Sequence, residues 1–504
     1  MELNLQNKDI VLKEKLFEGA QEQSLDAEIT LPDYYPEVSK ILNCSSQVMI
    51  HNKQCVGDTI SIGGQVKINI LYLDPDGEIN CYENTENFSK SIEVKIDIDD
   101  CLVEIETKTN YLNHKATAPR KMEFHGSVNL LCSVFKLCKE SIVTDIECDD
   151  VYTKKQILSF VEPSESIRKL SYIEDEISIG NYPAVNKIIR TDSKAEINEC
   201  KLLNQKCMVK GDLMIEIVYL SKDSRCFTLR HTHGFSQIID CDEVNEDTMC
   251  NADAKVISFE TRLKTTNEGE NCAVGFEAKV EIELNCFNKK ELEIVCDAFS
   301  SVCSLNSTVR NVRLINSIEK YTESFVCKKS YELPICGDEV IDCSCELDSS
   351  FSAVDNEKLV VKGSVNLGTL YKTSDDSISF YNKPIDFEYV RDDCADSDEY
   401  KTQVKIKAVN FTLAGDGIIN IEVEIEVSVI KMTVIQFKFL DEVIANECEV
   451  IQDEKTAIRL YFAEDESVWD IAKKYKTCPS RVCKINCIEN IDCMCNGVLL
   501  VPNC

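Results

Sequence analysis

Apolar and polar side chains alternate strictly in several stretches of the chain, which is the pattern of β-strands with one buried face. Three such stretches share one form: Val66, Ile68, Ile70 and Tyr72; Leu213, Ile215, Ile217 and Tyr219; and Val365, Leu367, Thr369 and Tyr371. Each is followed by a turn-rich segment (DPDG, SKDS or TSDDS) and then by a second strand. The pattern therefore predicts three β-hairpins.

Further stretches alternate between apolar and acidic positions. They contain Ala278, Val280, Ile282 and Leu284 on one face, and then Ile421, Val423, Ile425 and Val427, with mostly Glu or Lys between them. One apolar face and one charged face are typical of antiparallel sheets that bury one side only. The fold class expected is mainly β, built of antiparallel sheets.

The three hairpins are copies of one repeat. Its defining residues are Gly64, Tyr72 and Phe88; Gly211, Tyr219 and Phe235; and Gly363, Tyr371 and Phe387. In every copy Gly precedes Tyr by 8 residues and Tyr precedes Phe by 16. The glycines lie 147 and 152 residues apart, so the repeating unit has the size of a domain. Each Tyr ends an inward row, and we expect all three in the core.

A shared entry segment lies upstream of the glycine. It reads LPDYYPEVSKIL at residues 31–42, IGNYPAVNKII at 179–189 and, more weakly, LPICGDEVIDC at 333–343. Pro36 and Pro183 both precede their Gly by 28 residues, and the third copy lacks this Tyr-Pro pair. We place the domains at 1–160, 161–320 and 321–453, the last being the most diverged, with a separate module at 454–504. Only 17 Gly and 10 Pro in the chain predict closely coupled domains.

The C-terminal residues change character and predict a strand, two helices and a strand. Asp465 or Ser467 would cap a first helix whose apolar side chains recur at helical spacing in VWDIAKKY. Pro479 fits the first turn of a second helix, with Val482 and Ile485 directed inward. Residues 498–501 would form the closing strand. The single tryptophan, Trp469, lies on the first helix. We expect it to pack in the core of the module in preference to stacking on a sugar.

Residues 458–502 resemble a LysM domain through WDIAKKY, Asn486 and the closing NGVLLVP. The resemblance implies a shallow groove that binds the N-acetylglucosamine of peptidoglycan or chitin. Its candidate residues are Asp465, Glu466, Ser467, Val468, Trp469, Ile485, Asn486, Asn496 and Gly497. The usual Gly-Asp-Thr is Asp465-Glu466-Ser467 here, inside an acidic loop. Loss of the glycine removes backbone freedom near the sugar, so we expect a protein ligand ahead of a glycan.

Charge excludes some partners. The 504 residues include 55 Lys and Arg against 88 Asp and Glu, a formal charge of −33. Such a chain repels phosphate backbones and anionic lipid surfaces, so we expect no nucleic-acid partner. No run approaches the roughly 18 apolar residues of a membrane span, and the N-terminus lacks the apolar region of a signal peptide. We expect a soluble intracellular protein without a transmembrane segment.

Cysteine is abundant, with 28 residues against five His. No Cys-x-x-Cys pair of the kind that binds zinc occurs. Many cysteines, such as Cys132 and Cys286, fall where a strand would turn a small apolar side chain inward. Burial as small hydrophobes is therefore the leading interpretation, ahead of oxidative cross-linking in an assembly and of metal binding. We expect no metal site and no cofactor.

Enzyme motifs are missing from the sequence. It contains no P-loop, no Gly-x-Ser-x-Gly elbow and no His-Glu-x-x-His pair. With 28 Cys and 88 acidic residues, any selected catalytic pair is uninformative. We therefore expect that the protein is not an enzyme.

The repeats resemble SPOCS domains in the LPxYYPxVxKIL entry, the GxVxxxIxY hairpin and the segment DAFSSVCSL at residues 297–305. Together with the LysM-like module, the chain is similar to the family of clostridial spore-coat morphogenetic proteins. The resemblance implies a scaffold in the mother-cell cytoplasm, at the forespore surface, that binds a coat-basement ATPase of the SpoIVA type and promotes encasement of the spore. A peptidoglycan-binding protein acting through its LysM domain is the alternative.

Overall fold

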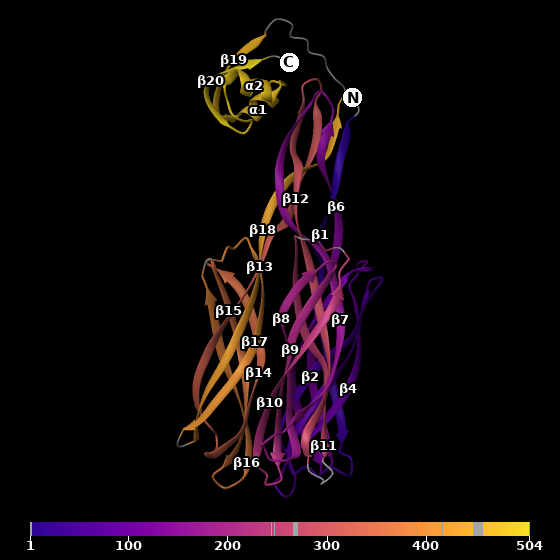
Figure 1. Cartoon of the computed structure of the whole chain (residues 1–504), viewed down its shortest axis with the longest axis vertical. Helices are drawn as coiled ribbons and strands as arrows, with labels where there is room; N and C mark the ends of the chain where they lie inside the picture. Colours follow the sequence, from indigo (N-terminus) through magenta and orange to yellow (C-terminus); the bar gives the residue numbers. More distant parts are fainter. Residues whose placement is uncertain are drawn as a thin grey trace.

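The computed structural model describes residues 3–242, 244–245, 247–265, 271–392, 394–414, 417–446 and 457–502. In this part of the chain, three consecutive six-stranded units precede a small C-terminal module (Figure 1). No described helix is long and apolar enough to cross a lipid bilayer.

The strands of the three units follow one another with short connections. The first unit contains β1 (Asn4–Thr30), β2 (Lys40–Val56), β3 (Thr59–Leu73), β4 (Ile79–Glu93), β5 (Leu102–Ala118) and β6 (Lys121–Glu147). The second contains β7 (Val151–Ser178), β8 (Val185–Leu203), β9 (Lys206–Ser221), β10 (Cys226–Asp240), β11 (Thr248–Thr265) and β12 (Asn271–Ser300). The third contains β13 (Leu305–Glu332), β14 (Gly337–Asp355), β15 (Lys358–Thr373), β16 (Ile378–Arg391), β17 (Glu399–Ala414) and β18 (Ile418–Ala445).

Each unit consists of two antiparallel three-stranded sheets with a common topology. One sheet has the order β2-β3-β4, β8-β9-β10 or β14-β15-β16, and the other has the order β1-β6-β5, β7-β12-β11 or β13-β18-β17. Each pair of sheets encloses one apolar core. The prediction of a mainly β fold with antiparallel sheets is confirmed.

The alternating positions explain how these cores form. The inward row of β3 from Val66 to Tyr72 is at most 2% exposed, and the matching rows of β9 and β15 are equally buried. Tyr72, Tyr219 and Tyr371 are 0%, 0% and 1% exposed, which confirms that all three are core residues. The rows predicted in β12 and β18 are buried as well.

The first and last strands of each unit are 27–30 residues long and extend beyond the sandwich. Figure 1 shows β6, β12 and β18 continuing past the sandwiches at one end of the molecule. Their extensions form a joint core from all three units, made of Ile10, Ile142, Leu158, Phe160, Ile294, Leu314 and Phe439. The extended ends of these strands thus form one bundle, which couples the three units.

These extensions correct the predicted domain boundaries. Residues 160 and 320 lie inside β7 and β13, because the first halves of these strands pair with the last strand of their own unit. Val151, for example, lies opposite Ser300 in the β7–β12 pair. The chain passes between units at 148–150 and 301–304. The boundary near 453 lies outside the described residues.

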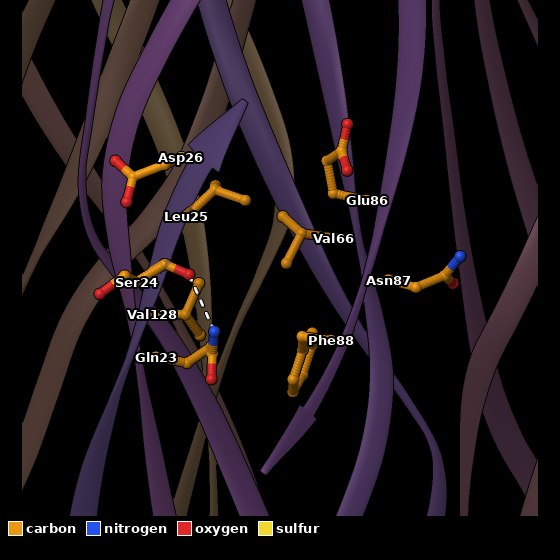
Figure 2. A pocket seen from close by; sticks show the side chains of 9 residues that line it. All are labelled: Gln23, Ser24, Leu25, Asp26, Val66, Glu86, Asn87, Phe88 and Val128. Atoms are coloured by element: carbon orange, nitrogen blue, oxygen red, sulfur yellow. Dashed lines mark hydrogen bonds between the residues drawn. The ribbon is translucent and has the colours of Figure 1, made fainter. Parts of the chain in front are cut away.

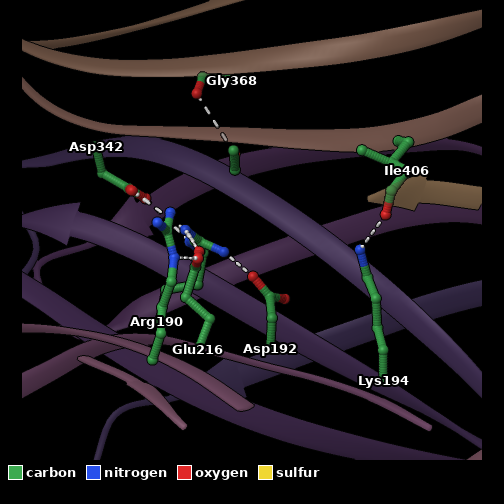
Figure 3. A network of polar contacts seen from close by, with 9 residues as sticks. Arg190, Asp192, Lys194, Glu216, Asp342, Gly368 and Ile406 are labelled. Carbon is green, nitrogen blue, oxygen red and sulfur yellow. Dashed lines mark hydrogen bonds and ion pairs between the residues drawn. The ribbon is translucent and has the colours of Figure 1, made fainter. Parts of the chain in front are cut away.

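The outward face of the repeated hairpins forms a second junction between units. Leu71, Val218 and Leu370, each seven residues after its repeat glycine, belong to one apolar cluster. Arg190 adds a polar contact between the second and third units (Figure 3). Its Nε lies 2.9 Å from Asp342 Oδ2, and its Nη2 lies 2.9 Å from Glu216 Oε1.

Candidate functional site: the C-terminal module

The C-terminal module (residues 457–502) has the predicted order of strand, helix, helix and strand. It consists of β19 (Ile458–Ser467), α1 (Val468–Lys474), α2 (Pro479–Asn486) and β20 (Met494–Pro502), with β19 and β20 antiparallel. The Ser467 hydroxyl accepts a hydrogen bond from the Asp470 backbone N–H and caps α1, and Pro479 opens α2. Of the two predicted caps, Ser467 is the one that the structure uses.

The two helices pack on one face of the β19–β20 pair. Val468, Ile471, Ala472 and Val482 are fully buried, in agreement with the prediction for the first helix and for Val482. The inward prediction for Ile485 is wrong, because this side chain is 40% exposed. The last turn of α2 instead directs Asn486 toward the sheet.

Asn486 fastens α2 to β20. Its amide group donates to the Leu500 carbonyl oxygen at 2.7 Å and accepts from the Leu500 N–H at 2.8 Å. A side chain that satisfies both backbone groups of one strand residue fixes the position of the strand. The predicted groove residue Asn486 therefore has a structural task.

Asp465 and Asn496 connect the two segments that would border a LysM groove. The Asp465 N–H donates to Asn496 Oδ1 at 3.0 Å, and Asn496 Nδ2 donates to Asp465 Oδ1 at 2.7 Å. Asp465 has a φ of +51°, a conformation that favours glycine. Gly497 follows with a φ of +103°.

Trp469 lies in the contact between the module and the second unit. Its indole Nε1 donates to Asp297 Oδ2 at 2.7 Å, and its ring meets Phe299 edge-on at 5.0 Å between centroids. Lys473 Nζ lies 2.7 Å from Asp297 Oδ1. The side chain is 2% exposed, so Trp469 is a core residue as predicted.

The nine predicted groove residues therefore do not share one surface. Ser467, Val468 and Trp469 are buried, and Asn486 is half-buried. Asp465, Ile485 and Asn496 are exposed, while Glu466 and Gly497 are half-buried.

The structure reveals an apolar face that sequence analysis missed. On the side of the β19–β20 pair away from the helices, Leu460, Phe462 and Val498 are 76%, 63% and 65% exposed. Phe462 lies directly opposite Val498 in the strand register. The signal was present, since Leu460 and Phe462 alternate with the inward-facing Tyr461 and Ala463. We call Leu460, Phe462 and Val498 the apolar face of the module.

The residues that define the repeat have structural roles. Gly64, Gly211 and Gly363 lie directly opposite Phe88, Phe235 and Phe387 in their hairpins. The Tyr72 hydroxyl donates to the Pro36 carbonyl at 3.2 Å, and Tyr219 donates to Pro183 at 3.0 Å. These bonds join the Tyr-Pro entry of each of the first two units to the hairpin of the same unit.

A pocket of about 270 Å³ opens at one side of the first unit beside Phe88 (Figure 2). Its other lining residues include Val66, Asp26 and Glu86. Asp26 Oδ1 lies 2.8 Å from Nδ1 of His125. The pocket thus lies against the repeat residue Phe88, between the two sheets of the unit.

The cysteines of the described residues are all free thiols. Cys132 and Cys286 are 0% and 1% exposed, which agrees with their interpretation as small buried hydrophobes. Within the part of the chain that the structure describes, no group of three or more His, Cys, Asp or Glu could hold a metal ion.

The comparison with protein families finds one description, the SPOCS domain of SipL, matched by residues 37–116 and 184–264. Two segments of the chain therefore match the SPOCS domain. The matched segments contain β2 to β4 and most of β5 in the first unit, and β8 to β10 and most of β11 in the second. No curated protein and no solved structure matches the chain.

The third unit repeats the architecture of these two SPOCS domains. It has the same sheet orders and the same Gly–Phe pair, here Gly363 opposite Phe387. Its entry differs, because Pro334-Ile335 stands where the first two units have Tyr-Pro. Gly337, two residues further on, packs against the ring of Tyr371. The SPOCS match suggests a sporulation-related protein.

Proposed function

We propose that this protein is a non-enzymatic scaffold of the spore envelope. In this proposal it acts in the mother cell, at the forespore surface, and binds a coat-basement ATPase of the SpoIVA type to promote coat assembly. The match to the SPOCS domain of SipL is the observation that carries the proposal. The C-terminal module, which we take to be a LysM domain, is the proposed binding element.

The architecture supports a role in which the three units hold the C-terminal module in place for a binding partner. The extended strands join the three units in one bundle, and the module contacts the end of that bundle through Asp297 and Phe299. Figure 1 shows the module at this end of the elongated molecule. A scaffold gains affinity when its binding element is held in place, because less freedom is lost on binding.

The apolar face of the module is the proposed contact. Phe462 and Leu460 are large apolar side chains exposed next to each other, which is the composition of an interface core. Glu464, Asp465 and Glu466 provide an acidic border. Such a surface suits a protein partner with an apolar centre and a basic rim.

The Asp465–Asn496 contact favours a protein ligand over a glycan. Their hydrogen bonds join the two segments between which a sugar would lie. Trp469, which could stack on a sugar, is directed toward Asp297. Peptidoglycan binding remains the alternative outcome of the experiment below.

The experiment measures binding of the full chain to a purified coat-basement ATPase. Phe462→Asp should weaken binding at least about 30-fold, because a central aromatic anchor contributes about 2 kcal/mol or more. The matched control is Phe351→Asp on β14, since Phe351 is 62% exposed and Phe462 is 63% exposed. The control should bind normally.

The same variants separate the alternatives. Unchanged binding of Phe462→Asp would exclude the apolar face as the contact. Co-sedimentation of the full chain with purified peptidoglycan would favour the glycan-binding alternative. In sporulating cells, a fluorescent fusion should form a shell around the forespore that Phe462→Asp disperses into the mother cell.

A further inference from the structure

Five cysteines of the second SPOCS domain meet in its core, although they come from different strands. They are Cys200 on β8, Cys207 on β9, Cys241 directly after β10, Cys250 on β11 and Cys286 on β12. The Sγ atoms of Cys250 and Cys286 are 2.9 Å apart, and those of Cys200 and Cys207 are 3.2 Å apart. The cluster therefore joins both sheets of the unit.

The first SPOCS domain shows what packing alone requires at these positions. Val103 lies opposite Val134 in the β5–β6 pair, just as Cys250 lies opposite Cys286 in the β11–β12 pair. Ile60 precedes Gly64 by the four residues that separate Cys207 from Gly211. Aliphatic side chains thus fill the sites of Cys207, Cys250 and Cys286 in the first unit. Packing at these three sites therefore does not require a thiol.

Cys250 and Cys286 are placed so that a disulfide bond can form between them. Directly opposed residues of an antiparallel pair have Cα atoms about 4.5–5.5 Å apart, which lies within the range of about 4.4–6.8 Å found in disulfides. The two sulfur atoms already touch. Formation of a disulfide between them needs no shift of either strand.

The surroundings shift the pKa values of the Cys250 and Cys286 thiols in opposite directions. Hydrogen bonds from Cys250 and Cys241 lower the pKa of Cys286 even though burial raises it. The hydrogen bond to Cys286, together with burial, raises the pKa of Cys250. Burial raises the pKa of Cys207 and Cys241 to about 12. Cys286 is therefore the member of this group that ionises first, and the thiolate is the reactive form.

We propose that Cys250 and Cys286 form a redox-active pair, which hydrogen peroxide converts into a disulfide between β11 and β12. Cys286 first releases its proton, and its thiolate attacks one peroxide oxygen, so that the O–O bond breaks and sulfenic acid and hydroxide result. The hydroxide takes up the released proton and becomes the first water. The Cys250 sulfur then attacks the sulfenic sulfur. The S–S bond forms, the S–O bond breaks, and the thiol proton leaves with hydroxide as water. Overall, two thiols and one peroxide give one disulfide and two waters.

The experiment treats the reduced full-length protein with hydrogen peroxide and stops the reaction with acid. Free thiols are then alkylated in denaturant, and the protein is digested without reductant for mass spectrometry. We expect a linked peptide pair containing Cys250 and Cys286, two hydrogen masses below the sum of its parts and lost on reduction. Alkylation of both cysteines should fall at least tenfold.

Two results would overturn the proposal. One is full alkylation of Cys250 and Cys286 when the exposed Cys272 and Cys336 are already oxidised. The other is recovery of Cys286 linked to Cys241 in place of Cys250.

The double variant Cys250→Val, Cys286→Val is the matched control, because it installs the Val103–Val134 pair of the first domain. It should fold and show no linked peptide from these positions. The thermal midpoint of the wild-type chain should rise after peroxide treatment, since a cross-link restricts the unfolded chain. The midpoint of the double variant should not rise. An equal rise in both proteins would place the responsible oxidation elsewhere.

Discussion

Gly211 lies directly opposite Phe235 in the β9–β10 hairpin, and the aromatic ring covers the glycine. A Cβ atom at Gly211 would lie 2.5 Å from Phe235 Cζ and 2.3 Å from the Glu196 carbonyl oxygen. The same close approach recurs at Gly64 and Gly363. The Gly–Phe spacing of the repeat therefore has a packing cause. In each unit, the phenylalanine ring occupies the space that a side chain at the glycine position would need.

Gly211→Ala should lower the free energy of unfolding of the second unit by about 1–3 kcal/mol, the usual cost of overpacking. One of the two obstructing groups is backbone, which cannot swing aside. The control is Gly234→Ala in the same hairpin, where the nearest atom would be 3.6 Å away. It should be neutral or stabilising by up to about 1 kcal/mol. Denaturant unfolding followed by circular dichroism measures both, and equal effects would contradict the packing argument.

Tyr219→Ala should cost about 3–5 kcal/mol of the free energy of unfolding, because Tyr219 is fully buried. Tyr219→Phe keeps the ring and removes only the hydrogen bond to the Pro183 carbonyl, so it should cost about 1 kcal/mol. The same denaturant titration compares the two variants. A loss below about 1 kcal/mol for Tyr219→Ala would show that the inward row of β9 does not hold the core together.

The hairpins could be predicted because their signals are local. Alternation over a few residues fixes which side of β3 is buried, and the Gly–Tyr–Phe spacing recurs within a single hairpin. The length of β7 could not be predicted, since its first half is held by Ser300 and its neighbours on β12, about 150 residues away. No local pattern marks where such a strand begins.

In the C-terminal module too, locally determined features could be predicted, whereas features that depend on distant residues could not. The caps and the buried row of α1 followed from helical spacing. The burial of Trp469 against the second unit depends on Asp297, 172 residues earlier in the chain. Ile485 was misplaced because the amide of Asn486 bonds to Leu500 and decides which side of the last turn faces the sheet.

Arg190→Met should destabilise the contact between the second and third units by about 3 kcal/mol. The Arg190 side chain is 23% exposed and Asp342 is 15% exposed, and an acid deprived of its partner in such a place is costly. Arg230→Met is the control, because Arg230 pairs with the same Glu216 but is 70% exposed. It should cost less than about 1 kcal/mol. Scanning calorimetry of the full chain measures both, and equal losses would contradict the role of burial.

The Arg190 contribution should depend on pH. Burial raises the pKa of Glu216, but hydrogen bonds and charge from Arg230 and Arg190 outweigh it and hold the pKa below 4.5. A depressed pKa stabilises the folded state above the ordinary value, and this stabilisation is lost as the pH falls through the depressed value. The stability difference between wild type and Arg190→Met should therefore shrink well below pH 4.5. A difference that stays constant from neutral to acidic pH would contradict this coupling.

Asp297→Ala should release the C-terminal module from the second unit. The Asp297 carboxylate is the shared acceptor of Trp469 Nε1 and Lys473 Nζ, so its loss leaves a buried indole N–H without its partner. Because Trp469 is the single tryptophan of the chain, its fluorescence reports this contact alone. We expect emission to shift to longer wavelength and amide hydrogen exchange in residues 457–502 to become faster.

The matched control is Asp441→Ala, at the corresponding end of the third unit. Asp441 faces Arg310 at 3.9 Å and its side chain is 40% exposed, so its loss should leave the emission of Trp469 unchanged. Lys473→Met should reproduce part of the effect of Asp297→Ala, since it removes the charge and keeps the indole hydrogen bond. Unchanged emission and exchange in Asp297→Ala would mean that the aromatic contact of Trp469 with Phe299 is enough to hold the module in place.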